Sequence, residues 1–361
     1  MNDTVSAGTG QQPLAQARAE ELDRLRGAHA AQASAASAFE LARALWRNGQ
    51  YESAVTHFTQ ARDLAPLAPD AHVALVRAAL MLADRGRAEA ALAQALAVYP
   101  QLPELAVHQA QVLVAADPAA ARAAVAPHRH TDVLCGLFHD ALDGVIAGRA
   151  PAARELGDRQ LDALWAGHGW LAARQPPPRL VGTPPELLLL ALAAARVTGL
   201  VLEFGVYFGR SLAQLAAAAG QVCHGFDSFQ GLPTAWTADE GAGAYSTAGL
   251  RPQLGPLVQL HAGWFQDTVP AFLAQHPGPI RLLHIDCDLY ESTSTVLTGC
   301  ADRLVAGSVI VFDDMLGYPG SEQHEFRAWH DFARDRGLAW RVLAGTLLGR
   351  EVAVRIDGTG A

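Results

Sequence analysis

The stretch Leu200-Val-Leu-Glu-Phe-Gly-Val-Tyr-Phe-Gly-Arg-Ser211 decides the fold class of this 361-residue chain. An apolar run ends in a carboxylate, two glycines follow four residues apart, and a segment suited to a helix begins at Arg210. This order predicts a strand, a tight turn and a helix, which is the repeating unit of a doubly wound α/β sheet. Gly205 and Gly209 would let the backbone approach a ligand, and the start of the helix would direct free N–H groups towards it.

The carboxylate of Glu203 indicates which ligand this glycine loop would take. A dinucleotide-binding loop has the spacing G-x-G-x-x-G and accepts a pyrophosphate, whereas E-x-G-x-x-x-G places an acid beside the glycines. That charge would repel a diphosphate, but it suits a cation such as the sulfonium or ammonium of S-adenosylmethionine. Asp227, at the end of a second apolar strand, is expected to accept the ribose hydroxyls of the same ligand. An ordinary strand–turn–helix with incidental acids is the alternative, and the loop and the two acids together favour the ligand site.

The composition excludes several classes of function. Hydrophobic residues make up 50% of the chain and charged residues 17%, so it can bury large cores. The formal net charge of −9, without a basic cluster, argues against a nucleic-acid partner. We see no secretory signal and no apolar run long enough to cross a bilayer, so we expect a cytoplasmic protein without a membrane partner. The sequence is compatible with a homo-oligomer.

Two N-terminal segments repeat each other in phase. Residues 45–61 and 82–98 carry glycine, an aromatic residue or alanine, and alanine at the same offsets, and Pro69 and Pro103 are 34 residues apart. This pattern predicts tetratricopeptide-like repeats, with a degenerate third repeat following; a plain alanine-rich helical bundle is the alternative. The triple proline after Gln175 is the predicted boundary to the α/β domain. The expected divisions are a flexible tail, disordered over Met1–Gln12, with a leading helix (1–29), an all-α repeat domain (30–127), a helical connector (128–179) and the α/β domain (180–361).

Acidic residues follow two later strands of the predicted sheet. The strand predicted at 280–286 ends in Asp286, and the strand predicted at 307–312 is followed by Asp313 and Asp314. The ends of adjacent parallel strands lie side by side, so these carboxylates are expected to converge and to be neutralised by a raised pKa or by a divalent cation. Oxygen ligands favour Mg²⁺, and capping of a turn is the alternative. His284 is either a core histidine or a second acid–base group, and Asp288 is expected to cap the next helix.

The long stretch between the second and third strands has no periodicity. Residues 231–255 contain proline, glycines and the aromatic residues Trp236 and Tyr245. A loop of this length inside a compact domain is usually functional, and the two aromatic residues favour a lid over the ligand site. A disordered insertion is the alternative.

Five ordered motifs carry a resemblance to a known family. They are Glu203-Phe-Gly-Val-Tyr-Phe-Gly-Arg-Ser211, Gly225-Phe-Asp-Ser-Phe-Gln-Gly-Leu-Pro233, Gly263-Trp-Phe-Gln-Asp-Thr-Val-Pro270, His284-Ile-Asp-Cys-Asp-Leu-Tyr-Glu-Ser-Thr293 and Val309-Ile-Val-Phe-Asp-Asp314. Over roughly residues 180–356 the chain resembles the macrocin O-methyltransferase family. The resemblance implies a class I methyltransferase domain over 180–361, S-adenosylmethionine as donor, and Mg²⁺ held by Asp286, Asp313 and Asp314, with Asp286 also the general base. The expected donor-site residues within these motifs are Glu203, Gly205, Tyr207, Gly209, Ser211, Asp227, Ser228, Gly263 and Trp264.

The resulting hypothesis is an S-adenosylmethionine-dependent O-methyltransferase of natural product biosynthesis. Its acceptor would be a small-molecule or carrier-bound hydroxyl of a sugar or secondary metabolite. The repeats would recruit the substrate, or a protein or peptide partner, without supplying catalytic groups. One alternative is a metal-independent methyltransferase in which His284 or Asp286 acts alone on a peptide held by the repeats. The other is a non-catalytic interaction protein that merely binds the nucleoside.

Overall fold

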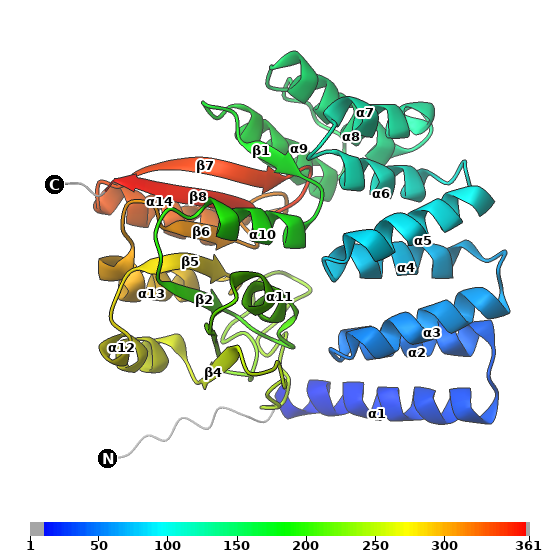
Figure 1. Cartoon of the computed structure of the whole chain (residues 1–361), viewed down its shortest axis with the longest axis horizontal. Helices are drawn as coiled ribbons and strands as arrows, with labels where there is room; N and C mark the ends of the chain where they lie inside the picture. Colours follow the sequence, from blue (N-terminus) through cyan, green and yellow to red (C-terminus); the bar gives the residue numbers. More distant parts are fainter. Residues whose placement is uncertain (1–10, 359–361) are drawn as a thin grey trace.

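The computed structural model describes residues 11–358, with side chains from Gln16 onwards. Helices form the N-terminal half, and a mixed sheet covered by helices forms the C-terminal half (Figure 1). Of the tail predicted over Met1–Gln12, residues 1–10 lie outside the described part, whereas Gln11 already belongs to helix α1 (Gln11–Ala31).

The predicted repeats are confirmed as three consecutive helix pairs. Proline occupies the first turn of three of these helices, where its missing N–H costs no hydrogen bond. Alanines at the helix contacts are fully buried, for example Ala54 and Ala88, so the paired helices approach closely. The pairs are α2 (Ala35–Arg47) with α3 (Tyr51–Leu64), α4 (Pro69–Met81) with α5 (Arg85–Val98), and α6 (Pro103–Leu113) with α7 (Pro118–Val125).

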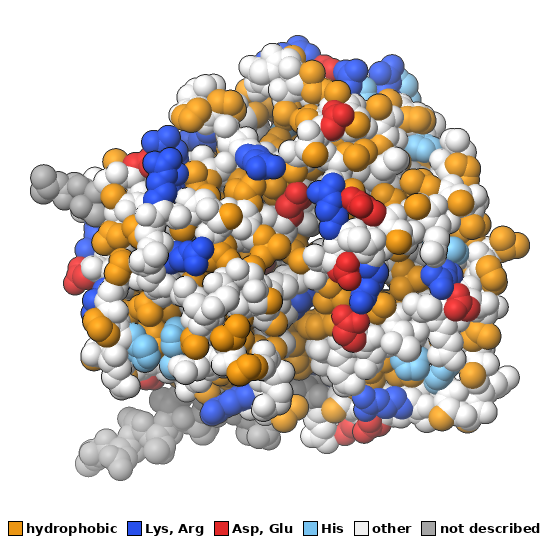
Figure 2. Space-filling model, viewed as in Figure 1, with side chains coloured by type: hydrophobic (Ala, Val, Ile, Leu, Met, Phe, Trp, Pro, Cys, Tyr) orange, Lys and Arg blue, Asp and Glu red, His pale blue; other side chains and the backbone are white. Residues whose placement is uncertain are grey.

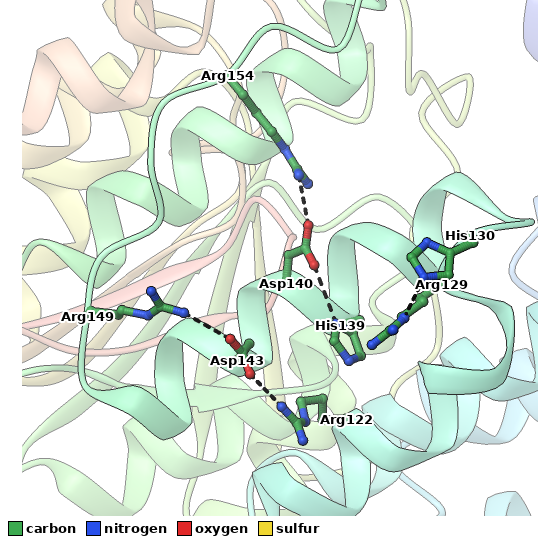
Figure 3. A network of polar contacts seen from close by, with 8 residues as sticks. All are labelled: Arg122, Arg129, His130, His139, Asp140, Asp143, Arg149 and Arg154. Atoms are coloured by element: carbon green, nitrogen blue, oxygen red, sulfur yellow. Dashed lines mark hydrogen bonds and ion pairs between the residues drawn. The ribbon is translucent and has the colours of Figure 1, made fainter.

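The connector contains η1 (Ala126–His128), α8 (Val133–Ala147) and α9 (Arg159–Ala172). Helix α8 ends at Gly148, which has a left-handed conformation (φ 63°), and an irregular segment separates it from α9. Ion pairs from Asp143 to Arg122 and Arg149 tie α8 to α7 and to this segment (Figure 3). These side chains are largely exposed, so each pair contributes little to stability.

An eight-stranded sheet forms the centre of the C-terminal half, in the order β1-β7-β8-β6-β5-β2-β3-β4. Strand β8 runs antiparallel to both of its neighbours, and the other pairings are parallel. The doubly wound prediction is therefore confirmed. The elements are β1 (Arg179–Val181), α10 (Pro184–Ala194), β2 (Leu200–Phe204), α11 (Arg210–Ala219), β3 (Cys223–Asp227), β4 (Val258–Ala262), α12 (Phe265–Gln275), β5 (Ile280–Ile285), α13 (Tyr290–Cys300), η2 (Ala301–Arg303), β6 (Val309–Phe312), η3 (Ser321–Gln323), α14 (Glu325–Asp335), β7 (Ala339–Thr346) and β8 (Val352–Gly358).

Strand β1 is the one strand that the sequence pattern does not predict. It has three residues, which is too short for a periodic signal, and it exists because it pairs with the edge of β7. The sequence pattern predicts seven strands, near 200–205, 222–226, 257–261, 280–286, 307–312, 338–344 and 350–356. Each observed strand from β2 to β8 lies within about two residues of its predicted position.

Two apolar cores cover the faces of the sheet, and a third joins the two halves of the molecule. Helices α12, α13 and α14 cover one face, whereas α10 and α11 cover the other. Successive strand residues divide between the faces, as Leu282 and Leu283 do. In the third core, Leu137 and Phe138 of α8 and Trp165 of α9 are grouped with Leu347 and Leu348, which follow β7.

On the face shown in Figure 2, acidic and basic side chains are interspersed among apolar ones. Among the described residues, no helix is both long enough and apolar enough to span a membrane.

Candidate active site

The carboxyl ends of the central strands open onto a cavity of about 690 Å³, a volume typical of small-molecule sites. One wall is built from the loops after β2 and β3 and the residues after β4. The opposite wall is built from the acids that follow β5 and β6. Five of the predicted donor-site residues line this cavity: Gly205, Tyr207, Asp227, Ser228 and Trp264.

The glycine loop is held in place by the carboxylate of Asp227. Its Oδ2 accepts hydrogen bonds from the backbone N–H groups of Val206 and Tyr207, both at 2.8 Å, and its Oδ1 accepts one from Phe229 at 2.6 Å. This carboxylate therefore joins the end of β3 to the turn after β2. Since each carboxylate oxygen has two acceptor sites, Asp227 keeps capacity for a ligand.

The two loop glycines are needed for close approach within the protein. Gly205 has φ 92°, and a Cβ there would collide with the backbone carbonyl of Asp286. Gly209 has φ 75°, and a Cβ there would collide with the side chain of Leu254. The loop is thereby pressed against the end of β5 and against the segment that precedes β4.

The structure places Glu203 differently from the expectation. Its side chain is fully buried within the sheet and does not line the cavity. Its Oε2 lies 2.8 Å from Nδ1 of His284, the residue beside it on β5, so its charge is matched by a neighbouring strand. Gly209, Ser211 and Gly263 also lie outside the cavity lining.

His284 bridges two acids inside the protein. Its Nδ1 faces Glu203, and its Nε2 lies 3.6 Å from Oδ1 of Asp313. Burial alone would lower the pKa of His284, but the nearby carboxylates of Asp313 and Glu203 raise that pKa well above its ordinary value. The geometry matches the core-histidine interpretation, in which a protonated imidazole holds Asp313 in place.

The acids divide into two groups at the strand ends. His284, Asp286 and Asp313 present ligand atoms within 4.8 Å of one another, and so do Asp286, Asp288 and Asp314. The expected trio of Asp286, Asp313 and Asp314 is therefore brought together around Asp286 but split between two clusters. The adjacent acids after β6 face different partners, since one approaches His284 and the other Asp288.

Asp288 does not cap helix α13 as expected. The N-cap residue of that helix is Leu289, without a side-chain hydrogen bond, whereas Asp288 is buried in a left-handed conformation with φ 63°. Its carboxylate lies in the second acid cluster. The spacing Asp286-Cys287-Asp288, two acids one residue apart after a strand, is the signal that could have found it.

The cluster carries more acid than its cations balance. Burial, and then the charge of Asp313, raise the pKa of Asp286 well above its ordinary value. Burial and the charge of Asp314 do the same for Asp288. For Asp314, burial and Asp313 raise the pKa to about 6, although Arg350 lowers it through a 2.8 Å ion pair.

Two further acids surround this cluster and had no sequence signal. Glu325 at the start of α14 is fully buried, and its Oε2 accepts a hydrogen bond from the backbone N–H of Asp314 at 3.1 Å. Glu351 lines the cavity, and burial followed by the charge of Asp313 raises its pKa to about 7. Such crowding favours either bound protons or a bound cation.

The loop between β3 and β4 forms the remaining wall. Leu232 and Trp236 pack with Leu289 and Tyr318, and Trp236 and Tyr245 line the cavity. The guanidinium carbon of Arg350 lies 5.8 Å from the centroid of the Trp236 ring. This wall of the cavity is therefore aromatic, with the Arg350 guanidinium as its cation, and it lies next to the acid cluster around Asp286.

Comparison with known proteins defines the class of domain that this fold and site represent. The model of a family described as a methyltransferase domain matches residues 202–315, and a tetratricopeptide repeat model matches residues 45–112. Together with the strand order, these matches show a class I methyltransferase domain preceded by helical repeats.

Two curated proteins are similar to parts of the chain. The 8-demethyl-8-(2,3-dimethoxy-alpha-L-rhamnosyl)-tetracenomycin-C 4'-O-methyltransferase of Streptomyces olivaceus is 37% identical over 57 residues, which is 16% of this chain and 21% of that protein. The demethyldecarbamoylnovobiocin O-methyltransferase of Streptomyces niveus is 35% identical over 81 residues, which is 21% of this chain and 29% of that protein. The chain thus spans less than a third of the curated relatives that it matches. Among solved structures, the calicheamicin methyltransferase CalS11 is 26% identical, with a TM-score of 0.36, over 47% of this chain and 76% of that one.

Proposed function

We propose that this protein is an S-adenosylmethionine-dependent O-methyltransferase that methylates a hydroxyl of a sugar or secondary metabolite. One observation carries the proposal: a single cavity joins the glycine loop and Asp227 to the acid cluster around Asp286. A donor on the loop side would then present its methyl group to an acceptor hydroxyl on the acid side. The similar proteins from Streptomyces olivaceus and Streptomyces niveus are O-methyltransferases of a rhamnosyl-tetracenomycin and of demethyldecarbamoylnovobiocin, which supports the choice of acceptor class.

The reaction requires an oxygen nucleophile and an acceptor for its proton. The hydroxyl oxygen attacks the methyl carbon, the carbon–sulfur bond breaks, and S-adenosylhomocysteine and a methyl ether form. We assign the hydroxyl proton to the carboxylate of Asp286, which lines the cavity where the two ligands would meet. Tyr207 and Asp227 would orient the donor, and the wall formed by Trp236 and Tyr245 would exclude water. His284 does not line the cavity, so its proposed role is to hold Asp313.

The donor atoms at the strand ends fit a hard divalent cation. Asp286, Asp288 and Asp314 are buried or half-buried, offer only oxygen ligands, and lie within 4.8 Å of one another. We propose that these three residues hold Mg²⁺, with Asp313 beside them. When bound there, the ion would neutralise the cluster and lower the pKa of a hydroxyl near it.

Calorimetry and methyl-transfer assays test the donor and the reaction. We expect the full-length protein to bind S-adenosylmethionine and S-adenosylhomocysteine and to ignore NAD. Mass spectrometry should show methylation of at least one acceptor in a panel of glycosylated aromatic compounds. This methylation should be lost when metal ions are removed with a chelator and should return when Mg²⁺ is added. NAD binding without donor binding would contradict the proposal. Unchanged activity after exhaustive chelation would favour the alternative in which Asp286 acts without a metal.

The repeats supply a separate surface for recruitment, which we propose for a carrier-bound substrate or a protein partner. Three arginines and three aromatic side chains line a hollow of about 260 Å³ on helices α2–α4. The three arginines of this hollow favour an acidic carrier. Loss of carrier binding in an Arg43→Ala, Arg77→Ala double variant would test this proposal.

The cytoplasmic location and the four-part division of the chain remain predictions.

A further inference from the structure

The helical half of the molecule contacts the proposed donor loop directly. Figure 1 shows the start of α1 next to the loop between β3 and β4. The Nη1 atom of Arg18 in α1 donates to the Tyr207 hydroxyl at 2.5 Å, and its Nη2 donates to the backbone carbonyl of Ser246 in that loop. One guanidinium therefore joins three segments that are far apart in sequence.

Tyr207 is held from a second side by the first repeat. Its hydroxyl donates to the backbone carbonyl of Arg47 at 3.2 Å, at the end of α2. Tyr207 also has an unfavourable left-handed backbone (φ 52°), so outside contacts help to keep it in place. Its ring lines the cavity and lies 6.0 Å from the ring of Tyr245 in the lid.

The turn between α2 and α3 presses against the neighbour of Tyr207. Gly49 has φ 72°, and a Cβ on it would lie 2.5 Å from Cβ of Phe208, so this turn reaches the loop only because the residue is glycine. Further along α11, the side chain of Gln214 donates to the carbonyl of Met81 in the second repeat at 2.9 Å. The repeats thus meet the strand–turn–helix unit at the turn and along the helix.

We propose that helix α1 and the first repeat are part of the donor site and that Arg18 is a positioning residue. Arg18, with the end of α2 and Gly49, holds Tyr207 and the lid at Ser246 in the geometry that closes the cavity over the donor. This inference rests on the proposed donor function. It revises the expectation that the repeats only recruit a partner, because the end of α2 and Gly49 of the first repeat contact the donor loop at Tyr207 and Phe208.

Arg18→Gln tests the proposal in the full-length protein. We expect the Kd for S-adenosylhomocysteine to rise about tenfold, since two hydrogen bonds from a charged group are lost. Amide hydrogen exchange should accelerate in residues 205–209 and 243–250, with the melting temperature unchanged. Arg18→Lys, which keeps the charge and one donor direction, should lose less affinity. Arg24→Gln, an exposed arginine of the same helix, is the matched control and should bind as the wild type.

Tyr207→Phe makes the same test from the other side. It removes the hydroxyl that accepts from Arg18 and donates to the Arg47 carbonyl, so its loss of affinity should not add fully to that of Arg18→Gln. If Arg18→Gln lowers the melting temperature, its affinity is not informative, and the affinity of the Tyr207→Phe variant is used instead. Wild-type affinity for S-adenosylhomocysteine in the variant used would overturn this inference and leave the proposed donor function unaffected. If the wild-type protein itself bound no donor, the proposed function would fail. Unchanged exchange of residues 243–250 in Arg18→Gln would then overturn the positioning role as well.

Discussion

At the scale of single residues, neighbours in sequence have separate environments. Asp313 is turned to His284, whereas Asp314 pairs with Arg350 and lies with Asp288. The acid that completes the second cluster therefore comes from the loop after β5, in a conformation that aspartate adopts more readily than most residues.

Asp288→Asn is expected to raise the Kd for Mg²⁺ roughly tenfold, because one carboxylate charge leaves the cluster. Asp313→Asn should have the smaller effect, since the Asp313 carboxylate is directed to His284. Titration with Mg²⁺ by calorimetry, or with Mn²⁺ by electron paramagnetic resonance, measures both without an activity assay. Asp239→Asn, at an exposed position of the loop between β3 and β4, is the control. A larger loss in Asp313→Asn than in Asp288→Asn would contradict this ligand set.

The buried side chain of His168 should make the free energy of unfolding depend on pH. It is 2% exposed in α9, and burial lowers its pKa to about 4 in the folded chain. The unfolded chain therefore binds more protons between about pH 6.5 and 4, so the free energy of unfolding should fall as the pH falls through this window, by up to about 3 kcal/mol. Urea unfolding at several pH values should show a shallower slope for His168→Leu and the wild-type slope for exposed His130→Gln. An unchanged slope in His168→Leu would show that this residue does not carry the effect.

At the scale of elements, the strand–turn–helix unit depends on a carboxylate from the next strand. Asp227 at the end of β3 accepts hydrogen bonds from two backbone amides of the turn after β2. The unit is local in sequence, but its geometry is completed by pairing with β3.

Asp227→Asn is expected to weaken donor binding about tenfold or more, because an amide nitrogen would face backbone N–H groups that now meet an oxygen. Calorimetry with S-adenosylhomocysteine measures the loss, and hydrogen exchange in residues 205–209 should accelerate. Asp70→Asn, exposed in α4, should leave donor affinity unchanged. Full affinity in Asp227→Asn would mean that the turn needs no support from β3.

At the scale of the whole molecule, the helical half and the α/β half pack against each other through a common apolar core. The core of Leu137, Phe138 and Trp165 includes two leucines that follow β7. A Cβ on Gly182 would collide with the backbone of Gln111 in α6, which shows how closely the repeats approach the start of the α/β half.

In calorimetry of the full chain, the part from α6 to the C-terminus should therefore unfold in a single transition. Leu137→Ala in the shared core should lower that transition for the whole unit, at a cost of about 2–5 kcal/mol in the free energy of unfolding. Leu64→Ala, at a position 52% exposed, should have little effect. Two separate transitions, with only the first moved by Leu137→Ala, would show that the halves unfold independently.

The sequence by itself determined the elements and the chemistry of their ends. Helix pairs, seven of the eight strands, the glycine turn and the acids after β5 and β6 follow from patterns within a few residues, because periodicity and turn chemistry act locally. For the same reason, Gly205, Asp227 and Asp286 could be placed near one site from strand order alone.

Only the tertiary structure decided which of these groups face one another. Glu203 faces His284 because β2 and β5 pair in that register, although the two residues are 81 positions apart. Arg18 reaches Tyr207 across 189 positions, and β1 exists only against β7. Such contacts depend on how distant segments pack, and local periodicity carries no record of that packing.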